Sequence, residues 1–214
     1  MSTFLLAFGL LALVMLGSGS FDGLNETFWW LGVLGINPLE FPGRSAVVMQ
    51  NFVGLLAANL MLAAIFAATI WAGLRLSRAD IGLSHAVRIF APTILPIALG
   101  YHVAHYLPSF LVESQYALAA LNDPLVRGDD LLGLGTFYVT TGFFNTPATV
   151  RLIFLSQAGA VVVGHVLAVM LAHGAAARHF GAARRAVLGH APLAIFMIGY
   201  TFFGLWLLAS PRGV

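Results

Sequence analysis

The sequence predicts an all-α, polytopic membrane helix bundle with about five transmembrane helices and interfacial or re-entrant segments in its outer loops. The chain of 214 residues is 60% hydrophobic and 8% charged, whereas a soluble domain carries about 25% charged residues. Its mean hydropathy is +0.93, and apolar runs of about 20 residues, enough to cross a bilayer, recur along it. The loops between them are short, so residues 1–214 are expected to form a single integral membrane domain.

Five apolar segments are the expected spans. They cover residues 3–17, 45–74, 87–107 (with a possible continuation to 121), 151–173 and 191–209. The first segment is short for a span. The third contains Pro92, Pro96 and Pro108, each of which removes a backbone donor and tends to kink a helix. A kink at Pro108 would free carbonyl groups near His105.

The arginines predict the orientation of the bundle. The loops after the second and fourth spans hold six arginines, and the other two loops hold most of the acids. Because cytoplasmic loops carry the excess of positive charge, the N-terminus is expected in the cytoplasm and the C-terminus in the periplasm of a bacterial inner membrane. The net charge of +2 is too small to indicate a nucleic-acid partner.

Both outer loops contain apolar stretches. Residues 24–36 include Phe28, Trp29 and Trp30, and tryptophan favours the membrane interface, so this stretch is expected to be an interfacial or re-entrant helix. Residues 131–144 are half apolar and are a second candidate to dip into the membrane. Together the two stretches are predicted to form a lid over the outer ends of the helices.

A polar stripe in the third apolar segment is the strongest functional signal. Its members follow one another at helical spacing: His102, His105, Tyr106, Ser109 and Glu113. Ionisable residues are costly inside a membrane and usually mark function. A further histidine, His165, lies midway along the fourth span.

The histidines allow three interpretations. His102, His105 and His165 can be ligands of a divalent transition metal (Zn, Fe, Mn or Cu), since imidazoles and a carboxylate suit these ions. Alternatively, His102 and His165 can be axial ligands of haem b, with small residues such as Gly100 and Gly164 making room. In the third interpretation the histidines form hydrogen bonds between helices and fix their packing.

Two acids are candidates for the chemistry. Glu113 and Asp22, the latter at the outer edge of the first span, are each a candidate general base or fourth metal ligand. The chain has no cysteine, which excludes disulfides, thiolate nucleophiles and iron–sulfur clusters.

Several stretches resemble a known family. They are SFDGL, GINPLEFPGRSAV, YHVAHYLPSFLV, QYALAALNDP, FYVTTGFFNT, QAGAVVVGHVLAVMLAH and YTFFGLWLLASP. The chain resembles the C-terminal half of a family of larger bacterial polytopic membrane proteins, some of them labelled fenitrothion (organophosphate) hydrolase. The resemblance places Asp22, His102, His105 and His165 in the shared motifs.

The expected function is therefore a metal-dependent membrane hydrolase of small lipophilic esters, organophosphates among them. A metal held by histidines would lower the pKa of bound water and provide a nucleophile. The alternatives are an electron-transfer subunit that binds haem b or a quinone, and a non-catalytic subunit of a larger membrane complex. Because the resemblance covers half of a longer protein, the chain is expected to assemble as a homo-oligomer or with other membrane subunits.

Overall fold

A computed structural model describes residues 2–40, 43–135, 137–181 and 183–212. Its α-helices are α1 (Ser2–Asn25), α2 (Phe28–Val33), α3 (Val48–Ser77), α4 (Leu83–Phe90), α5 (Leu95–Asn122), α6 (Pro147–Phe180) and α7 (Ala183–Ala209). Short 3-10 helices are η1 (Pro38–Glu40), η2 (Arg44–Val47), η3 (Ala91–Ile94) and η4 (Gly142–Phe144). Within these ranges five helical segments are long and apolar enough to cross a membrane, and no strand is formed. The predicted all-α membrane bundle is confirmed.

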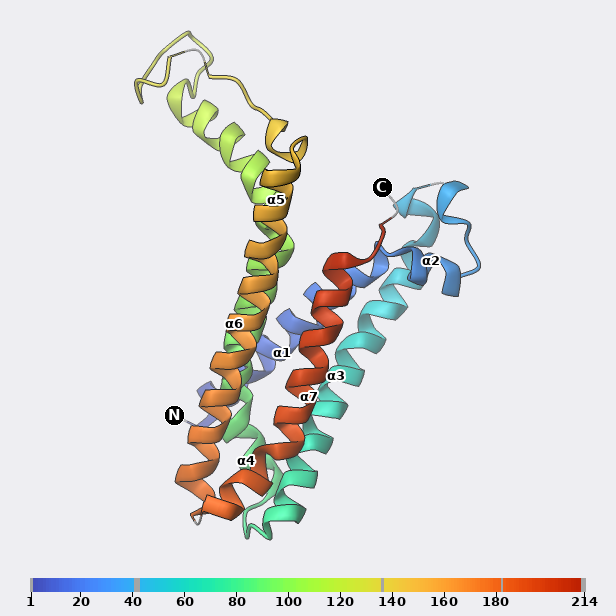
Figure 1. Cartoon of the computed structure of the whole chain (residues 1–214), viewed down its shortest axis with the longest axis vertical. Coiled ribbons are helices and arrows are strands. Elements are labelled where there is room, and N and C mark those ends of the chain that lie inside the picture. The colour runs from blue at the N-terminus through green and yellow to red at the C-terminus, as the bar shows by residue number, and fades with distance from the viewer. Residues whose placement is uncertain (1, 41–42, 136, 182, 213–214) are drawn as a thin grey trace.

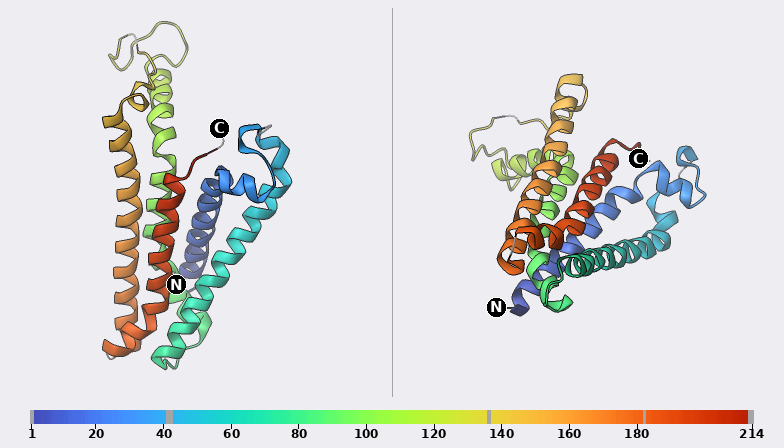
Figure 2. Two further views of the ribbon diagram at one scale, coloured as in Figure 1. Left: turned by 45° about the vertical axis from the view of Figure 1, so that its right-hand side comes forward. Right: turned by 60° about the horizontal axis from the view of Figure 1, so that its bottom comes forward.

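The helices form two arms that are joined at one end. Helices α5 and α6 run side by side as one arm, and α3 belongs to the other. Helix α1 crosses between the arms and contacts both α5 and α3, and α7 packs against both α6 and α3 (Figure 1). Figure 2 shows the same separation of the two arms from a second direction. The buried core lies near the joined end and includes Phe66, Phe90, Ile94 and Met197. The opposite halves of the helices diverge, which leaves room for a site between them.

The prolines of the third span act at three different places. Pro92 lies in the first turn of η3 and Pro96 in the first turn of α5, where a missing N–H costs no helical hydrogen bond. Pro108 lies inside α5, which continues to Asn122. The carbonyl that Pro108 leaves without its helical donor is that of Ala104, four residues earlier. Gln157 of α6 donates its side-chain N–H to this carbonyl at 2.7 Å.

Several helices are longer than the expected spans, α1 and α6 among them. Helix α1 continues through Gly17 to Asn25 and carries Asp22 in its last turn. Helix α6 has 34 residues, which corresponds to about 51 Å, whereas the hydrocarbon core of a bilayer is about 30 Å thick. The end formed by α5 and α6 therefore extends past the ends of α3 and α7, as Figure 1 shows.

Tryptophans occur at two levels of the bundle. At the outer level Trp30 donates its indole N–H to Asn51 Oδ1 at 2.9 Å, and Trp29 contacts Trp206 edge to face. At the other level Trp71 lies beneath the guanidinium of Arg75. Asn51 and Trp71 are separated on α3 by about 20 residues, or roughly 30 Å. This spacing matches the thickness of a bilayer, so both levels are expected at its interfaces.

The two outer loops do not form a common lid. Residues 24–36 contain the short helix α2, as the tryptophans indicated, whereas residues 131–144 form a loop whose described part contains only η4. Figure 1 shows the first loop beside the C-terminus and the second at the tip of the α5–α6 arm, well apart. The lid prediction is wrong because α5 and α6 are long enough to carry their loop away from α2.

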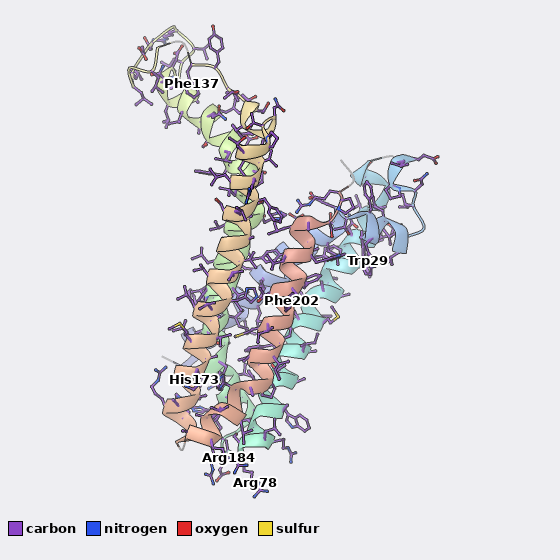
Figure 3. All side chains as sticks on the ribbon, in the orientation of Figure 1. Trp29, Arg78, Phe137, His173, Arg184 and Phe202 are labelled. Atoms are coloured by element: carbon purple, nitrogen blue, oxygen red, sulfur yellow. The ribbon has the colours of Figure 1, made fainter. Side chains whose placement is uncertain are left out.

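The accessibility of the arginine-rich loops to a reagent outside the cell tests the orientation of the bundle. Arg78 and Arg184 lie at the same end, where the two arms join (Figure 3). We expect single cysteines in place of the exposed residues Ser84 and Ala183 to resist an impermeant thiol reagent in intact cells, because arginine-rich loops stay in the cytoplasm. The chain has no native cysteine, so the readout has no background. Labelling of both positions in intact cells would reverse the predicted orientation.

Candidate functional site

A groove of about 700 Å³ lies between α1, α3 and α5 in the half where the arms diverge. Its polar lining residues are Ser18, Asp22, Asn25, Asn51, His102 and Tyr106. Its rim includes Val14, Val48 and Phe52, which are apolar and more than half exposed. In a membrane-spanning helix such exposed apolar side chains face lipid, so the groove is accessible from the bilayer. Because Asn51 also binds Trp30, the groove begins at the level of that tryptophan and extends toward the middle of the bundle.

The central contact of the site joins Asp22 of α1 to His105 of α5. Asp22 Oδ2 lies 2.8 Å from His105 Nε2. A carboxylate only accepts hydrogen bonds, so Nε2 of His105 carries the hydrogen. The Asp22 side chain is 44% exposed and lines the groove, whereas that of His105 is 11% exposed and lies behind it. His105 therefore orients the carboxylate, and the carboxylate is the reactive group that the groove presents.

His102 contributes a second basic atom to the groove. Its Nδ1 lies 2.9 Å from the carbonyl oxygen of Ala98, so Nδ1 donates and the neutral ring leaves Nε2 with a lone pair. Gly19 of α1 faces the ring, and a Cβ there would approach His102 Cε1 to 3.6 Å. Tyr106 packs against the rings of both His102 and His105.

His165 does not join this group. It is 5% exposed on α6 and donates from Nδ1 to the carbonyl of Val161 at 2.7 Å. Its nearest aromatic neighbour is Tyr200 of α7, with ring centroids 6.3 Å apart. Among the described residues no three histidines or acids lie close enough together to hold a metal ion. The metal site of His102, His105 and His165 stays a prediction that this arrangement does not support.

The small residues expected to make room for haem have another role. A Cβ on Gly100 of α5 would overlap the carbonyl oxygen of Ala160, and one on Gly164 of α6 would lie 2.5 Å from that of Pro96. Both glycines thus allow the two helices to pack in direct backbone contact. The space beside His102 and His165 that haem b would need is filled on this side by the neighbouring helix.

Glu113 lies apart from the other site candidates. It is exposed, and it follows His105 by eight residues of α5, which is about 12 Å along the axis. The groove lining does not include it. Of the two acids indicated by the sequence, only Asp22 contacts a histidine of the stripe.

Several polar contacts had no clear sequence signal. Ser20 and Tyr200 share a hydrogen bond of 2.5 Å between α1 and α7, and the rings of His173 and His190 lie 4.8 Å apart between α6 and α7. His190 is buried. The only signal for each was a polar residue within an apolar run. Such a residue needs a partner, but no spacing rule identifies a partner on another helix.

Comparisons with family models, with curated proteins and with solved structures find no match for this chain. The fold and the groove define a multi-pass helical membrane protein with an ionisable site at membrane depth. Any assignment of chemistry therefore depends on the residues of the site.

Proposed function

We propose that this protein is a membrane-embedded hydrolase of small lipophilic esters and that the reaction takes place in the groove between α1, α3 and α5. The observation that carries the proposal is the hydrogen bond between Asp22 and His105 at the wall of an otherwise largely apolar groove. An ionisable pair at this depth is costly unless it serves a function. The earlier resemblance to proteins labelled organophosphate hydrolase suggests the same reaction class.

In this proposal Asp22 acts as the general base. It takes a proton from a water molecule as the oxygen of that water attacks the carbonyl carbon or the phosphorus of the ester. The bond to the leaving alcohol or phenol oxygen then breaks, that oxygen takes the proton from Asp22, and the carboxylate is regenerated. His105 holds the carboxylate by its N–H bond. Donors for the developing negative charge are available in the hydroxyl of Tyr106 and the amide N–H₂ of Asn51, whose oxygen is already occupied by Trp30.

The groove suggests the kind of substrate. Exposed apolar side chains such as Val14, Val48 and Phe52 stand where lipid is expected, so a lipophilic ester can enter sideways from the bilayer. The volume of about 700 Å³ suits a molecule of drug size. A charged substrate would have to leave water for this apolar entrance, which is unfavourable.

The test uses the purified protein in lipid nanodiscs with chromogenic nitrophenyl esters. We expect release of nitrophenol from uncharged carboxylic or phosphoric esters and much slower release from an anionic phosphate ester with the same leaving group. Equal rates with empty nanodiscs for every ester would contradict the proposal.

Metal content tests the mechanism separately. The described residues offer no group of three histidines or acids that could hold a metal ion, so the proposed mechanism uses none. We expect less than one equivalent of zinc, iron, manganese or copper per purified chain by elemental analysis, and hydrolysis that survives a chelator. One tightly held equivalent, lost together with activity, would instead support the metal-dependent reaction that the sequence suggested.

A further inference from the structure

A second hollow lies at the opposite, arginine-rich end of the bundle. It measures about 510 Å³ and is formed where α3 turns into α4. Its lining includes Trp71, Arg75, Arg78, Asp80, Ile81 and Leu83. Arg78 lies at the tip of the bundle in Figure 3. The hollow is far from the groove of Asp22, and the proposed hydrolysis does not use it.

The end of α3 holds the two arginines around this hollow. Arg78 follows the last helical residue with φ 51° and donates its backbone N–H to the carbonyls at the end of α3. Glycine is the usual residue in this left-handed position, because it has no Cβ to clash. Arg75 lies one turn earlier, with its guanidinium carbon 5.2 Å from the centre of the Trp71 ring.

Both guanidinium groups lack a carboxylate partner within the described part of the chain. The ion pairs found there join Asp22 to His105 and Glu26 to Arg212. Asp80 lines the same hollow but forms no ion pair with either arginine. With two arginines and one aspartate, the hollow carries a net positive charge.

The surroundings of the hollow are those of a membrane interface. Trp71 marks the level where the hydrocarbon ends, and aromatic residues of this kind are enriched there. Ile81 and Leu83 supply an apolar wall next to the charged groups. A ligand that fits this wall and these charges is amphiphilic and negatively charged.

We propose that the hollow binds the headgroup of an anionic phospholipid of the phosphatidylglycerol type. Arg75 and Arg78 bind the phosphate, since a guanidinium matches phosphate oxygens with two parallel N–H donors. Asp80 accepts a hydrogen bond from a glycerol hydroxyl of the headgroup. A lipid that ends in a bare phosphate has no such hydroxyl. Basic pockets between membrane helices bind anionic headgroups in this way.

The experiment measures lipid retained by the detergent-solubilised, full-length protein in native mass spectrometry. We expect phosphatidylglycerol to be retained at least tenfold more than phosphatidylcholine of the same chains. The double change Arg75→Gln with Arg78→Gln is expected to remove this preference. The matched control changes Arg184 and Arg185 to glutamine, which removes two charges at the same end outside the hollow.

Each outcome decides one point. Equal loss in the control pair would show a general surface-charge effect and overturn the site, as would unchanged retention in the Arg75 and Arg78 variant. Inorganic phosphate at millimolar concentration should not displace the lipid; displacement would indicate a site for free phosphate. If the double variant does not fold, Arg75→Lys with Arg78→Lys keeps the charge, and it should lower retention by losing the paired donors. The unmodified protein must in any case prefer phosphatidylglycerol, and equal retention of both lipids would contradict the proposal.

Discussion

Asp22→Asn should lower kcat/KM for ester hydrolysis by about 10²–10⁴-fold, the usual contribution of a general base. The asparagine preserves the shape of the side chain and its hydrogen bond to His105 but has no basic oxygen to accept a proton from water. The measurement is nitrophenol release by the nanodisc-embedded variant, with circular dichroism to show that the helices are intact. A loss smaller than about threefold would remove Asp22 from the reaction.

Glu113→Gln is the discriminating comparison. Asp22 and Glu113 are both acids, but Glu113 is exposed on α5 and does not line the groove. We expect its rate to stay within about twofold of the unmodified protein. A large loss of activity in this variant, together with full activity of Asp22→Asn, would identify Glu113 as the general base instead of Asp22.

Gly164→Ala is expected to lower the stability of the bundle markedly. Its Cβ would lie 2.5 Å from the carbonyl oxygen of Pro96, in backbone that cannot rotate away, so α5 and α6 would have to separate. Overpacking of this kind costs about 1–3 kcal/mol. The thermal midpoint of the detergent-solubilised protein, followed by circular dichroism, should fall by several degrees.

Gly159→Ala provides the control on the same helix. A Cβ at this position meets no atom within 4 Å, and alanine favours a helix over glycine by roughly 0.5–1 kcal/mol. Its thermal midpoint should therefore stay unchanged or rise slightly. A similar decrease in both variants would show that the loss does not come from contact between α5 and α6.

The sequence predicted the helices better than it predicted the contacts between them. Long apolar runs are a strong signal, because every backbone group must be satisfied within a helix in lipid. The exact ends of the helices were harder to predict: α1 continues through Gly17 to Asn25, and α7 begins at Ala183, well before the expected start at residue 191. At Pro108 the freed carbonyl is bound by Gln157, a partner that no local pattern reveals.

The candidate site was predictable only in its parts. Helical spacing indicated that His102 and His105 lie near one face, and the cost of burial indicated that they need partners. The place of His165 midway along the fourth span suggested it as a partner, but position along a helix does not specify which face of α6 points toward α5. The contact that forms joins His105 to Asp22, two residues 83 positions apart on helices whose mutual rotation depends on the whole bundle.

Helix α5 does not satisfy all of its own backbone hydrogen bonds, because the carbonyl of Ala104 is bound by the side chain of Gln157. One turn of α5 depends on a side chain of α6 for a bond that helices normally form internally. Neither helix of this pair is therefore an independent module of the membrane domain. Separation of α5 from α6 would expose the Ala104 carbonyl to hydrocarbon, so we expect the two helices to enter the membrane as a pair.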